Sequence, residues 1–317
     1  MSYNTQTLWK KIKSVISDRL YLTSFLLSAA FLLCVGIGLI SYDWISSREP
    51  QAINDEVVGS VDTHKENEPF NVLLLGCDVS KIRTDTIMMI NVDPEAKTIR
   101  FLSIPRDTKI RIYGNYQKIN ASVPLGGYDL LFKNLKEITG APIHYYVSIS
   151  PGTFAKIVDA LGGVEYNVEQ NMYYSDPKQG LYINLKKGQQ TLNGNQAEQY
   201  CRFRRYAMGD ITRTEHQQKF LVELLKQKLQ LQYITKIPDI FDVIREDIKT
   251  NITPVTVLDN LEIAKMFAGG SVAMETVETP GHYNDMHVEG ISYYLIDKEK
   301  VLEICKDKFL GSGESGK

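Results

Sequence analysis

One long apolar segment near the N-terminus constrains this chain more than any other feature. It runs from Leu20 to Tyr42 without a charged side chain. Because an α-helix rises about 1.5 Å per residue and the hydrocarbon core of a bilayer is about 30 Å thick, roughly 20 apolar residues are needed to cross it. The segment meets that length, so the sequence predicts one transmembrane helix over residues 20–42.

The charges beside this segment predict its orientation. Basic side chains dominate the flank before it, namely Lys10, Lys11, Lys13 and Arg19. The flank after it is mixed and leans acidic, and positive flanks stay in the cytoplasm, so we expect residues 1–19 there. A cleaved signal peptide is the alternative, but its apolar region spans about 7 to 15 residues before an A-x-A-like site. We therefore expect a retained signal anchor, single-pass in the cell membrane, with the rest of the chain outside the cytoplasm.

The remainder of the chain divides into a linker and one large domain. Residues 43–69 mix charge, Ser, Gly and Pro with little periodicity, which is typical of a flexible stalk. Residues 70–317 have a length that suits one extracytoplasmic domain.

Composition excludes several classes of protein. Lys and Arg number 36 against 38 Asp and Glu, so the chain lacks the basic excess of a nucleic-acid-binding protein. Cys34 falls in the predicted membrane helix, and the three remaining cysteines cannot all pair with one another. Their spacing matches no zinc motif. The sequence also carries no Walker A loop, no dinucleotide-binding glycine motif and no H-E-x-x-H.

Strand-like and helical patterns alternate through the domain. Apolar, β-rich runs cover residues 70–78, 84–93, 97–105, 145–149 and 164–168, and strand-like runs recur at 272–281 and 291–309. Helical patterns cover residues 128–140, 152–163 and about 214–231. This alternation predicts an α/β domain whose central sheet is covered by helices on both faces.

The first chemical cluster lies between the first two predicted strands. It supplies Asp78, Arg83 and Asp85 within one short segment. Two such carboxylates can share Mg²⁺, which is commonly held by one or two carboxylates together with substrate phosphate oxygens. A salt-bridged turn between strands is the alternative.

The second cluster follows the third predicted strand. Arg106 stands at the strand end, where it can reach a ligand. It can equally pair with Asp107 or a neighbouring carboxylate, and this cluster taken alone favours such an ion pair over a ligand-binding role.

The third cluster is rich in arginine. Arg202 and Arg204 alternate in a strand-like register and are expected to share a face, whereas Arg205 is expected to point to solvent. Arg213 and Gln217 lie four apart near the start of the long helix, whose N-terminus carries a partial positive charge. Because Arg is suited to bidentate phosphate contacts, these residues predict an anion pocket.

In this order, the clusters resemble the LytR-CpsA-Psr family of bacterial cell-envelope phosphotransferases over residues 71 to about 231. The resemblance rests on LLLGCD, RTDTIMMINVDP, FLSIPRDT, QKINAS, FAKIVDALGGVE, KKGQQTLNGNQAEQYCRFR and GDITRTEHQQ. It implies an α/β sandwich with a central mixed sheet, a hydrophobic channel for a polyprenyl tail, and arginines that grip a pyrophosphate.

The activity implied is Mg²⁺-dependent transfer of a glycopolymer, such as teichoic acid or capsule, from a polyprenyl pyrophosphate carrier to peptidoglycan. A pyrophosphate hydrolase and a membrane-bound envelope regulator or attenuator without transferase activity are the alternatives. The partners implied are the lipid-linked glycan, peptidoglycan and the bilayer, with no nucleic acid.

The resemblance also implies roles for individual residues. Asp78 and Asp85 correspond to the carboxylates near the metal. The catalytic and substrate-binding positions are Arg83, Arg106, Arg202, Arg204, Arg213 and Gln217. The chain departs from the family pattern at His216, where an arginine is usual. It also departs at Cys77 and Cys201, where Ser or a small apolar residue is more common, and a disulfide between these two cysteines beside the site is one alternative.

Overall fold

The structure is a computed structural model that describes most of residues 61–310. The described residues are 61–64, 68–78, 83–177, 180–203, 210–228, 230, 233, 240, 244, 247–253, 256, 260, 263, 272–283 and 291–310. For residues 210–214 only the backbone is described. The expected cytoplasmic segment and transmembrane helix lie outside these residues. Among the described helices, none combines the length and the apolar character needed to cross a membrane.

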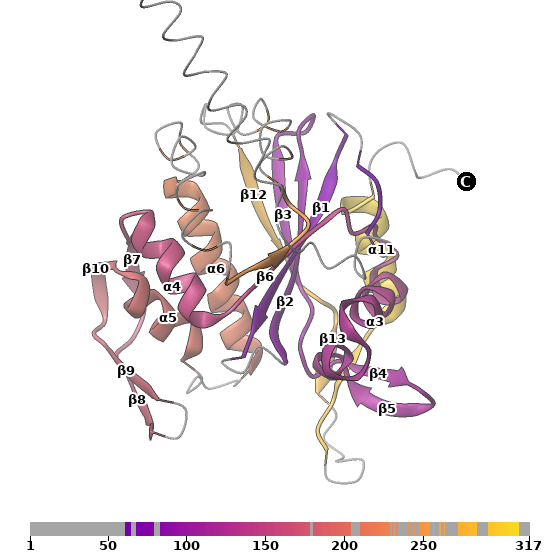
Figure 1. The fold of residues 1–317 in the computed structure, drawn as a ribbon, viewed down its shortest axis with the longest axis horizontal. Coiled ribbons are helices and arrows are strands. Elements are labelled where there is room, and N and C mark those ends of the chain that lie inside the picture. The colour runs from indigo at the N-terminus through magenta and orange to yellow at the C-terminus, as the bar shows by residue number, and fades with distance from the viewer. Residues whose placement is uncertain are drawn as a thin grey trace, which may run out of the picture. The chain divides into compact units, whose positions relative to one another are not determined.

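A mixed six-stranded sheet forms the centre of the described part of the chain (Figure 1). Its strands, in spatial order, are β11 (Lys249–Thr250), β6 (Tyr145–Ile149), β1 (Phe70–Cys77), β2 (Thr84–Asp93), β3 (Thr98–Ser103) and β12 (Ala273–Val277). β2 pairs antiparallel with β1 and β3, whereas β6 and β12 run parallel to β1 and β3. The sheet strands predicted at 70–78, 84–93, 97–105 and 145–149 are therefore observed, and β12 lies within the strand-like run at 272–281.

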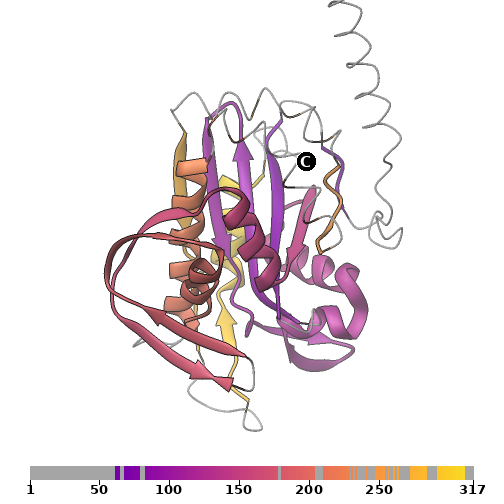
Figure 2. The same cartoon turned by 60° about the vertical axis from the view of Figure 1, so that its left-hand side comes forward.

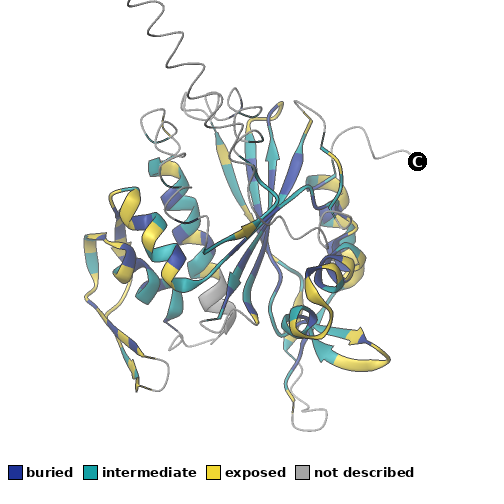
Figure 3. Ribbon diagram, in the orientation of Figure 1, coloured by how far each residue is buried: buried dark blue, intermediate teal, exposed yellow. Residues whose placement is uncertain are grey.

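Both faces of the sheet are buried, which explains the nearly continuous apolar runs of its strands. Leu73 and Leu75 of β1 pack into one core, and Val72 and Leu74 pack against the other. Figure 3 shows the buried residues concentrated along these strands.

Helices cover the two faces, as predicted. α3 (Ser122–Thr139) and α11 (Lys298–Lys308) pack on one face through Leu131, Leu135 and Val301. α6 (Asp210–Lys228) packs on the other through Leu221 and Leu225. Figures 1 and 2 show these helices on opposite sides of the sheet, so the mixed α/β prediction is confirmed.

A second group of elements packs beside α6 around Tyr166, Tyr200 and Phe220. It comprises α4 (Pro151–Ala160), α5 (Gly194–Arg202), β7 (Val164–Val168), β8 (Met172–Asp176), β9 (Leu181–Leu185) and β10 (Gly188–Leu192). α4 ends before Gly162 and Gly163, both of which have positive φ, as the glycine pair predicts.

Two hairpins complete the described part. They are β4 (Lys109–Ile112) with β5 (Asn115–Lys118), and β13 (Gly281–Tyr283) with β14 (Tyr294–Ile296). A short 3-10 helix, η1 (Ile119–Ala121), connects β5 to α3.

The start of the described chain is attached to the domain. Asp62 exchanges two hydrogen bonds with the backbone of Ile143, at 2.8 and 2.7 Å, and its carboxylate lies 2.7 Å from Nζ of Lys136. His64 contacts the hydroxyl of Tyr145 at 3.1 Å. The last part of the expected stalk thus contacts the start of β6.

Three local predictions need correction. The run at 291–309 is not all strand-like, because Asp297 caps α11 by accepting a hydrogen bond from the backbone N–H of Lys300. The long helix begins at Asp210, before the expected Thr214.

The strand-like register expected for Arg202 and Arg204 is also wrong. Arg202 is the last residue of helix α5, and Arg204 lies outside the described residues. Asn193 and Gln196 form a capping box that starts this helix.

Candidate functional site

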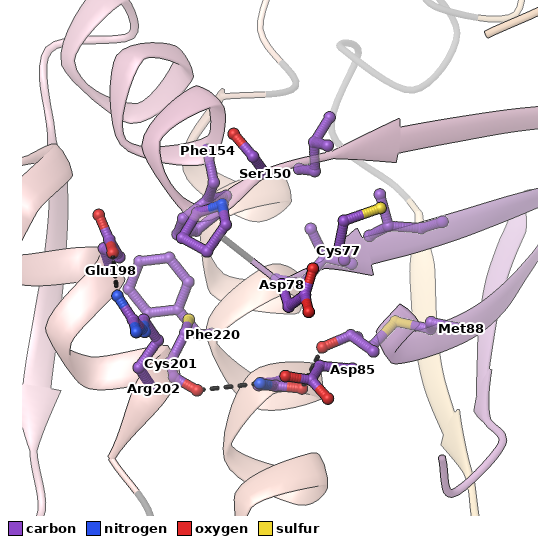
Figure 4. Close-up of a pocket in the computed structure, with 17 residues that line it drawn as sticks. Cys77, Asp78, Asp85, Met88, Ser150, Phe154, Glu198, Cys201, Arg202 and Phe220 are labelled. Atoms are coloured by element: carbon purple, nitrogen blue, oxygen red, sulfur yellow. Dashed lines mark hydrogen bonds and ion pairs between the residues drawn. The ribbon is translucent and has the colours of Figure 1, made fainter. Parts of the chain in front are cut away.

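A pocket lies between one face of the sheet and helices α4, α5 and α6 (Figure 4). Its empty volume is about 970 Å³, including the part open to solvent. The apolar lining residues are Leu74, Met88, Ile149, Pro151, Phe154, Phe220 and Leu221. The polar lining residues are Asp78, Asp85, Thr86, Ser150, Glu198, Arg202 and Gln217, with Gly76, Cys77 and Cys201 between them.

The two acidic groups come from neighbouring strand ends. The β1–β2 register shifts between Gly76 and Cys77, and the backbone N–H of Asp78 donates to the carbonyl of Arg83 at 2.9 Å. Arg83 in turn donates its backbone N–H to the Asp78 carboxylate at 3.3 Å. The hairpin geometry therefore brings Asp78 and Asp85 to one pocket, whereas the Arg83 side chain is exposed and is not among the lining residues.

Arg106 reaches the site through Asp85. Its Nη1 donates to Oδ1 of Asp85 at 2.7 Å, while its Nε lies 4.0 Å from Asp107. Arg106 is not itself among the pocket-lining residues. The predicted cation at the end of β3 thus sits next to one of the two acidic groups.

Arg202 enters the pocket from the end of α5. Its Nη1 lies 2.8 Å from Oε1 of Glu198, one helical turn earlier, and Figure 4 shows this pair on the opposite side of the pocket from Asp78 and Asp85. The sequence does not predict Glu198 as a site residue, because the alternation of Arg202 and Arg204 indicates a strand, and a strand gives Arg202 no partner four residues earlier. The capping box at Asn193 and Gln196 was the signal that would have predicted the helix and hence this pairing.

Gln217 is held by both ends of its side-chain amide. Its Oε1 accepts a hydrogen bond from the Thr86 hydroxyl at 3.0 Å, and its Nε2 donates to the carbonyl of Cys201 at 2.9 Å. It joins α6 to β2 and to the end of α5. Arg213 lies in the same helix, but its side chain is not described.

His216, the expected departure from the family pattern, is not among the pocket-lining residues. Its Nδ1 lies 2.9 Å from the hydroxyl of Tyr200 and 3.5 Å from Glu169. Burial lowers the pKa of His216, and the nearby Glu169 carboxylate partly opposes that effect. This histidine therefore belongs to a polar network inside the second group of elements.

The three described cysteines are free thiols, so the structure contains no Cys77–Cys201 bridge. Cys77 Sγ lies 3.0 Å from the Ser148 hydroxyl. Burial raises the pKa of Cys201 to about 12, and burial does the same for Cys305. At neutral pH Cys201 and Cys305 are thus protonated and unsuited to nucleophilic chemistry.

The acidic pair suits a divalent cation that is shared with a ligand. Within the described residues, no group of three or more His, Cys, Asp or Glu side chains is arranged to hold a metal. Asp78 and Asp85 line the same pocket and offer carboxylate oxygens, the donors that Mg²⁺ uses together with phosphate oxygens. The donor set therefore fits Mg²⁺ only if the ligand completes the coordination.

Comparison with known proteins extends these observations. A model of the LytR_cpsA_psr family matches residues 41–309. The chain is 30% identical over 249 residues to the polyisoprenyl-teichoic acid–peptidoglycan teichoic acid transferase TagU of Bacillus subtilis (strain 168), covering 76% of this chain and 78% of the relative. It is 29% identical over 271 residues to TagV of the same organism, a transferase with the same description, covering 82% of this chain and 67% of the relative.

Solved structures show the same fold. The crystal structure of B. subtilis TagV has a TM-score of 0.66 at 26% identity and covers 77% of this chain and 98% of its own. A structure of TagT bound to LIIa-WTA has a TM-score of 0.63 at 26% identity, with 79% of this chain and 93% of its own covered. The relatives are named as transferases, in agreement with the predicted enzyme class, a phosphotransferase.

Proposed function

The chain belongs to the LytR_cpsA_psr family, and we propose that it transfers a glycopolymer from a polyprenyl pyrophosphate carrier to a hydroxyl of peptidoglycan. In this reaction the acceptor oxygen forms a bond to the phosphorus that carries the polymer. The bond from that phosphorus to the bridging oxygen breaks, polyprenyl phosphate leaves, and the acceptor hydroxyl loses its proton.

One observation carries this proposal, namely the division of the pocket into apolar and charged parts. Phe154, Phe220 and Leu221 offer contacts to a hydrocarbon chain, while Asp78 and Arg202 offer contacts to a charged group. A ligand with an apolar tail and an anionic head matches both parts. A polyprenyl pyrophosphate is such a ligand, and the names of the relatives point to the same class of carrier.

The arginines act on charge and on orientation. Arg202 is held by Glu198 and Arg106 by Asp85, so each guanidinium is oriented before a ligand arrives. A pyrophosphate oxygen competes for the same N–H donors, and Arg–phosphate contacts can be bidentate. By resemblance, Arg204 and Arg213 extend this set. Positioned donors of this kind stabilise the charge that develops during phosphoryl transfer.

Asp78 and Asp85 are proposed to hold Mg²⁺ together with phosphate oxygens. When bound, the ion would neutralise charge on the phosphates. Asp85 is also engaged by Arg106, whereas Asp78 is held by the backbone of Arg83. Asp78 is therefore the better candidate to orient the acceptor hydroxyl.

The predicted membrane helix over residues 20–42 would fix the proposed enzyme to the cell membrane. An enzyme fixed to the bilayer that contains its polyprenyl substrate meets that substrate at a raised effective concentration. In this account the N-terminus lies in the cytoplasm and the catalytic domain lies outside it.

The test is incubation of the full chain in detergent micelles with Mg²⁺, a lipid-linked glycopolymer and peptidoglycan fragments. We expect ligated product, which mass spectrometry detects as a phosphodiester between polymer and glycan. Release of free glycan phosphate without ligation would support a pyrophosphate hydrolase instead. No reaction from a correctly folded chain would support a regulator without transferase activity.

A further inference from the structure

The outer face of the β4–β5 hairpin carries positive charge. Lys109 pairs with Lys118 and Arg111 pairs with Tyr116, and paired residues of adjacent strands share a face. Ile112 points the other way and is 2% exposed. The hairpin sequence from Lys109 to Lys118 contains no Asp or Glu, so the hairpin itself contributes only positive charge to this face, hereafter the cationic face.

Aromatic rings lie among these cations. Nζ of Lys109 is 3.9 Å from the ring centroid of Tyr116 and 5.7 Å from that of Tyr293. The Arg111 guanidinium is 5.8 Å from the Tyr116 ring. Tyr116 is 55% exposed, and Tyr113 at the tip of the hairpin is 75% exposed. Rings exposed to this degree, beside cations, offer both a flat surface and hydroxyl groups to a ligand.

Ion pairs link the base of the hairpin to the pocket, although Figure 1 shows the hairpin beside α3 and the pocket helices α4, α5 and α6 on the other side of the sheet. Lys118 Nζ lies 3.0 Å from Asp107, the neighbour of Arg106, and Arg106 pairs with the pocket residue Asp85. The backbone N–H of Asn120, just after the hairpin, donates to the carbonyl of Arg106 at 3.2 Å. The base of the hairpin is therefore fastened to the loop that carries Arg106, and Figure 1 shows β4 and β5 near the end of the sheet at which β2 begins.

We propose that the cationic face binds the phosphate groups of an anionic glycopolymer, a chain of units joined by phosphodiesters, while the pyrophosphate end of the same molecule occupies the pocket. This inference rests on the proposed function and narrows its substrate class. Lys109 and Arg111 lie two residues apart on one strand, a separation of about 6.6 Å, so they form a row that suits a repeating anion. Of the three cations, Lys118 alone pairs with a carboxylate among the described residues. Arg111 donates from Nε to the carbonyl of Gly114 at 3.1 Å, so its Nη groups and the Lys109 ammonium are the donors offered to a phosphate.

Binding is measured first, without turnover. The full chain in detergent micelles is titrated with soluble poly(glycerol phosphate) by calorimetry, and neutral dextran serves as the comparison. The variant K109Q/R111Q is expected to weaken poly(glycerol phosphate) binding about tenfold. The control K186Q/K187Q removes the same charge from the exposed turn between β9 and β10 and should bind as the native chain does.

Salt provides a second readout of the same contact. Raising the ionic strength from about 0.05 to 0.2 M should weaken binding more for the native chain than for K109Q/R111Q, because screening acts on charges that the variant lacks. Equal binding by native chain and hairpin variant would overturn the inference. So would a variant that keeps its affinity for poly(glycerol phosphate) but no longer binds vesicles of anionic phospholipid, because the face would then recognise lipid head groups.

Turnover with two substrates separates this inference from the proposed function. One is a lipid-linked polymer with phosphodiester repeats, and the other is a short lipid-linked saccharide without them. K109Q/R111Q should lower kcat/KM about tenfold for the first and leave the second unchanged. An equal loss for both substrates would overturn the inference. If the native chain transfers neither, the proposed function fails and the binding measurement alone decides the role of the face.

Discussion

The hydroxyl of Thr86 donates a 3.0 Å hydrogen bond to Oε1 of Gln217. Since Nε2 of Gln217 donates to the carbonyl of Cys201, the residue before Arg202, the same side chain ties the arginine-bearing end of α5 to strand β2. The resemblance implies that Gln217 binds substrate. In the structure its amide already makes two contacts within the protein, and one N–H remains for a ligand.

This arrangement predicts that Thr86 positions the site. Thr86→Val keeps the side-chain shape and removes the donor, so kcat/KM for transfer should fall about five- to tenfold, the effect of losing one hydrogen bond of about 1 kcal/mol. Thr98→Val removes a hydroxyl at the start of β3, where it donates to Ala96, and is the control. If Thr86→Val retained native kcat/KM, the hydrogen bond to Gln217 would have no part in positioning.

Arg202 is expected to be indispensable for turnover. Arg202→Ala removes a pocket cation and should lower kcat by about a hundredfold or more, the range seen when one positioned donor is lost from a reaction centre. Lys226→Ala, which removes an exposed cation from α6, should leave kcat near the native value. Circular dichroism checks that both variants fold, and a folded Arg202→Ala protein with native kcat would refute the assignment.

Glu198 should tune Arg202 without being required. Glu198→Gln weakens the 2.8 Å ion pair but keeps the size of the side chain. We expect a change in KM of about threefold, because a partly exposed pair contributes at most about 1 kcal/mol. A loss of kcat as large as that of Arg202→Ala would instead assign Glu198 a direct part in the reaction.

Divalent cations should control the reaction through Asp78 and Asp85. Chelation with EDTA is expected to abolish transfer, and added Mg²⁺ should restore it. Asp78→Asn and Asp85→Asn should each raise the Mg²⁺ concentration needed for half-maximal rate. Full activity of the native chain in EDTA would contradict the proposed metal site.

Stability should fall below neutral pH because of two half-buried histidines. Burial lowers the pKa of His144, whose Nδ1 accepts a 2.9 Å hydrogen bond from the backbone N–H of Asn71, and burial also lowers the pKa of His216. As the pH falls, these histidines therefore bind protons in the unfolded chain before they do so in the folded chain. Their contribution to the free energy of unfolding is complete above the unfolded pKa of about 6.5 and is lost as the pH falls towards the lower pKa values of the folded chain.

Urea unfolding at about pH 7.5 and pH 5.5 measures this effect. The native chain should have a lower free energy of unfolding at the acid pH. His144→Asn should show a smaller difference between the two conditions, since one of the titrating groups is gone. An identical difference in both proteins would show that His144 does not contribute.

The sheet and its acidic strand ends were predictable because their signals are local. The strands β1, β2 and β3 are continuous apolar runs joined by short polar connections, and a hairpin brings Asp78 and Asp85 together whatever the rest of the chain does. The helical patterns of α3 and α4 end at glycines with positive φ.

The rest of the pocket was not predictable in the same way. The pocket receives Phe154, Glu198 and Phe220 only because α4, α5 and α6 pack together over the sheet. The spacing of residues in the sequence does not predict that packing. The alternation of Arg202 with Arg204 indicates a strand, whereas Arg202 is in fact the last residue of a capped helix. The position of His216, turned towards Tyr200, likewise depends on tertiary contacts.

The most direct measurement follows the phosphorus atom itself. A lipid-linked glycopolymer labelled at the phosphate that carries the polymer is incubated with the full chain, Mg²⁺ and peptidoglycan. We expect the label in a phosphodiester joined to peptidoglycan, while polyprenyl phosphate is released unlabelled. Label found only in a soluble phosphomonoester, with none in peptidoglycan, would contradict it.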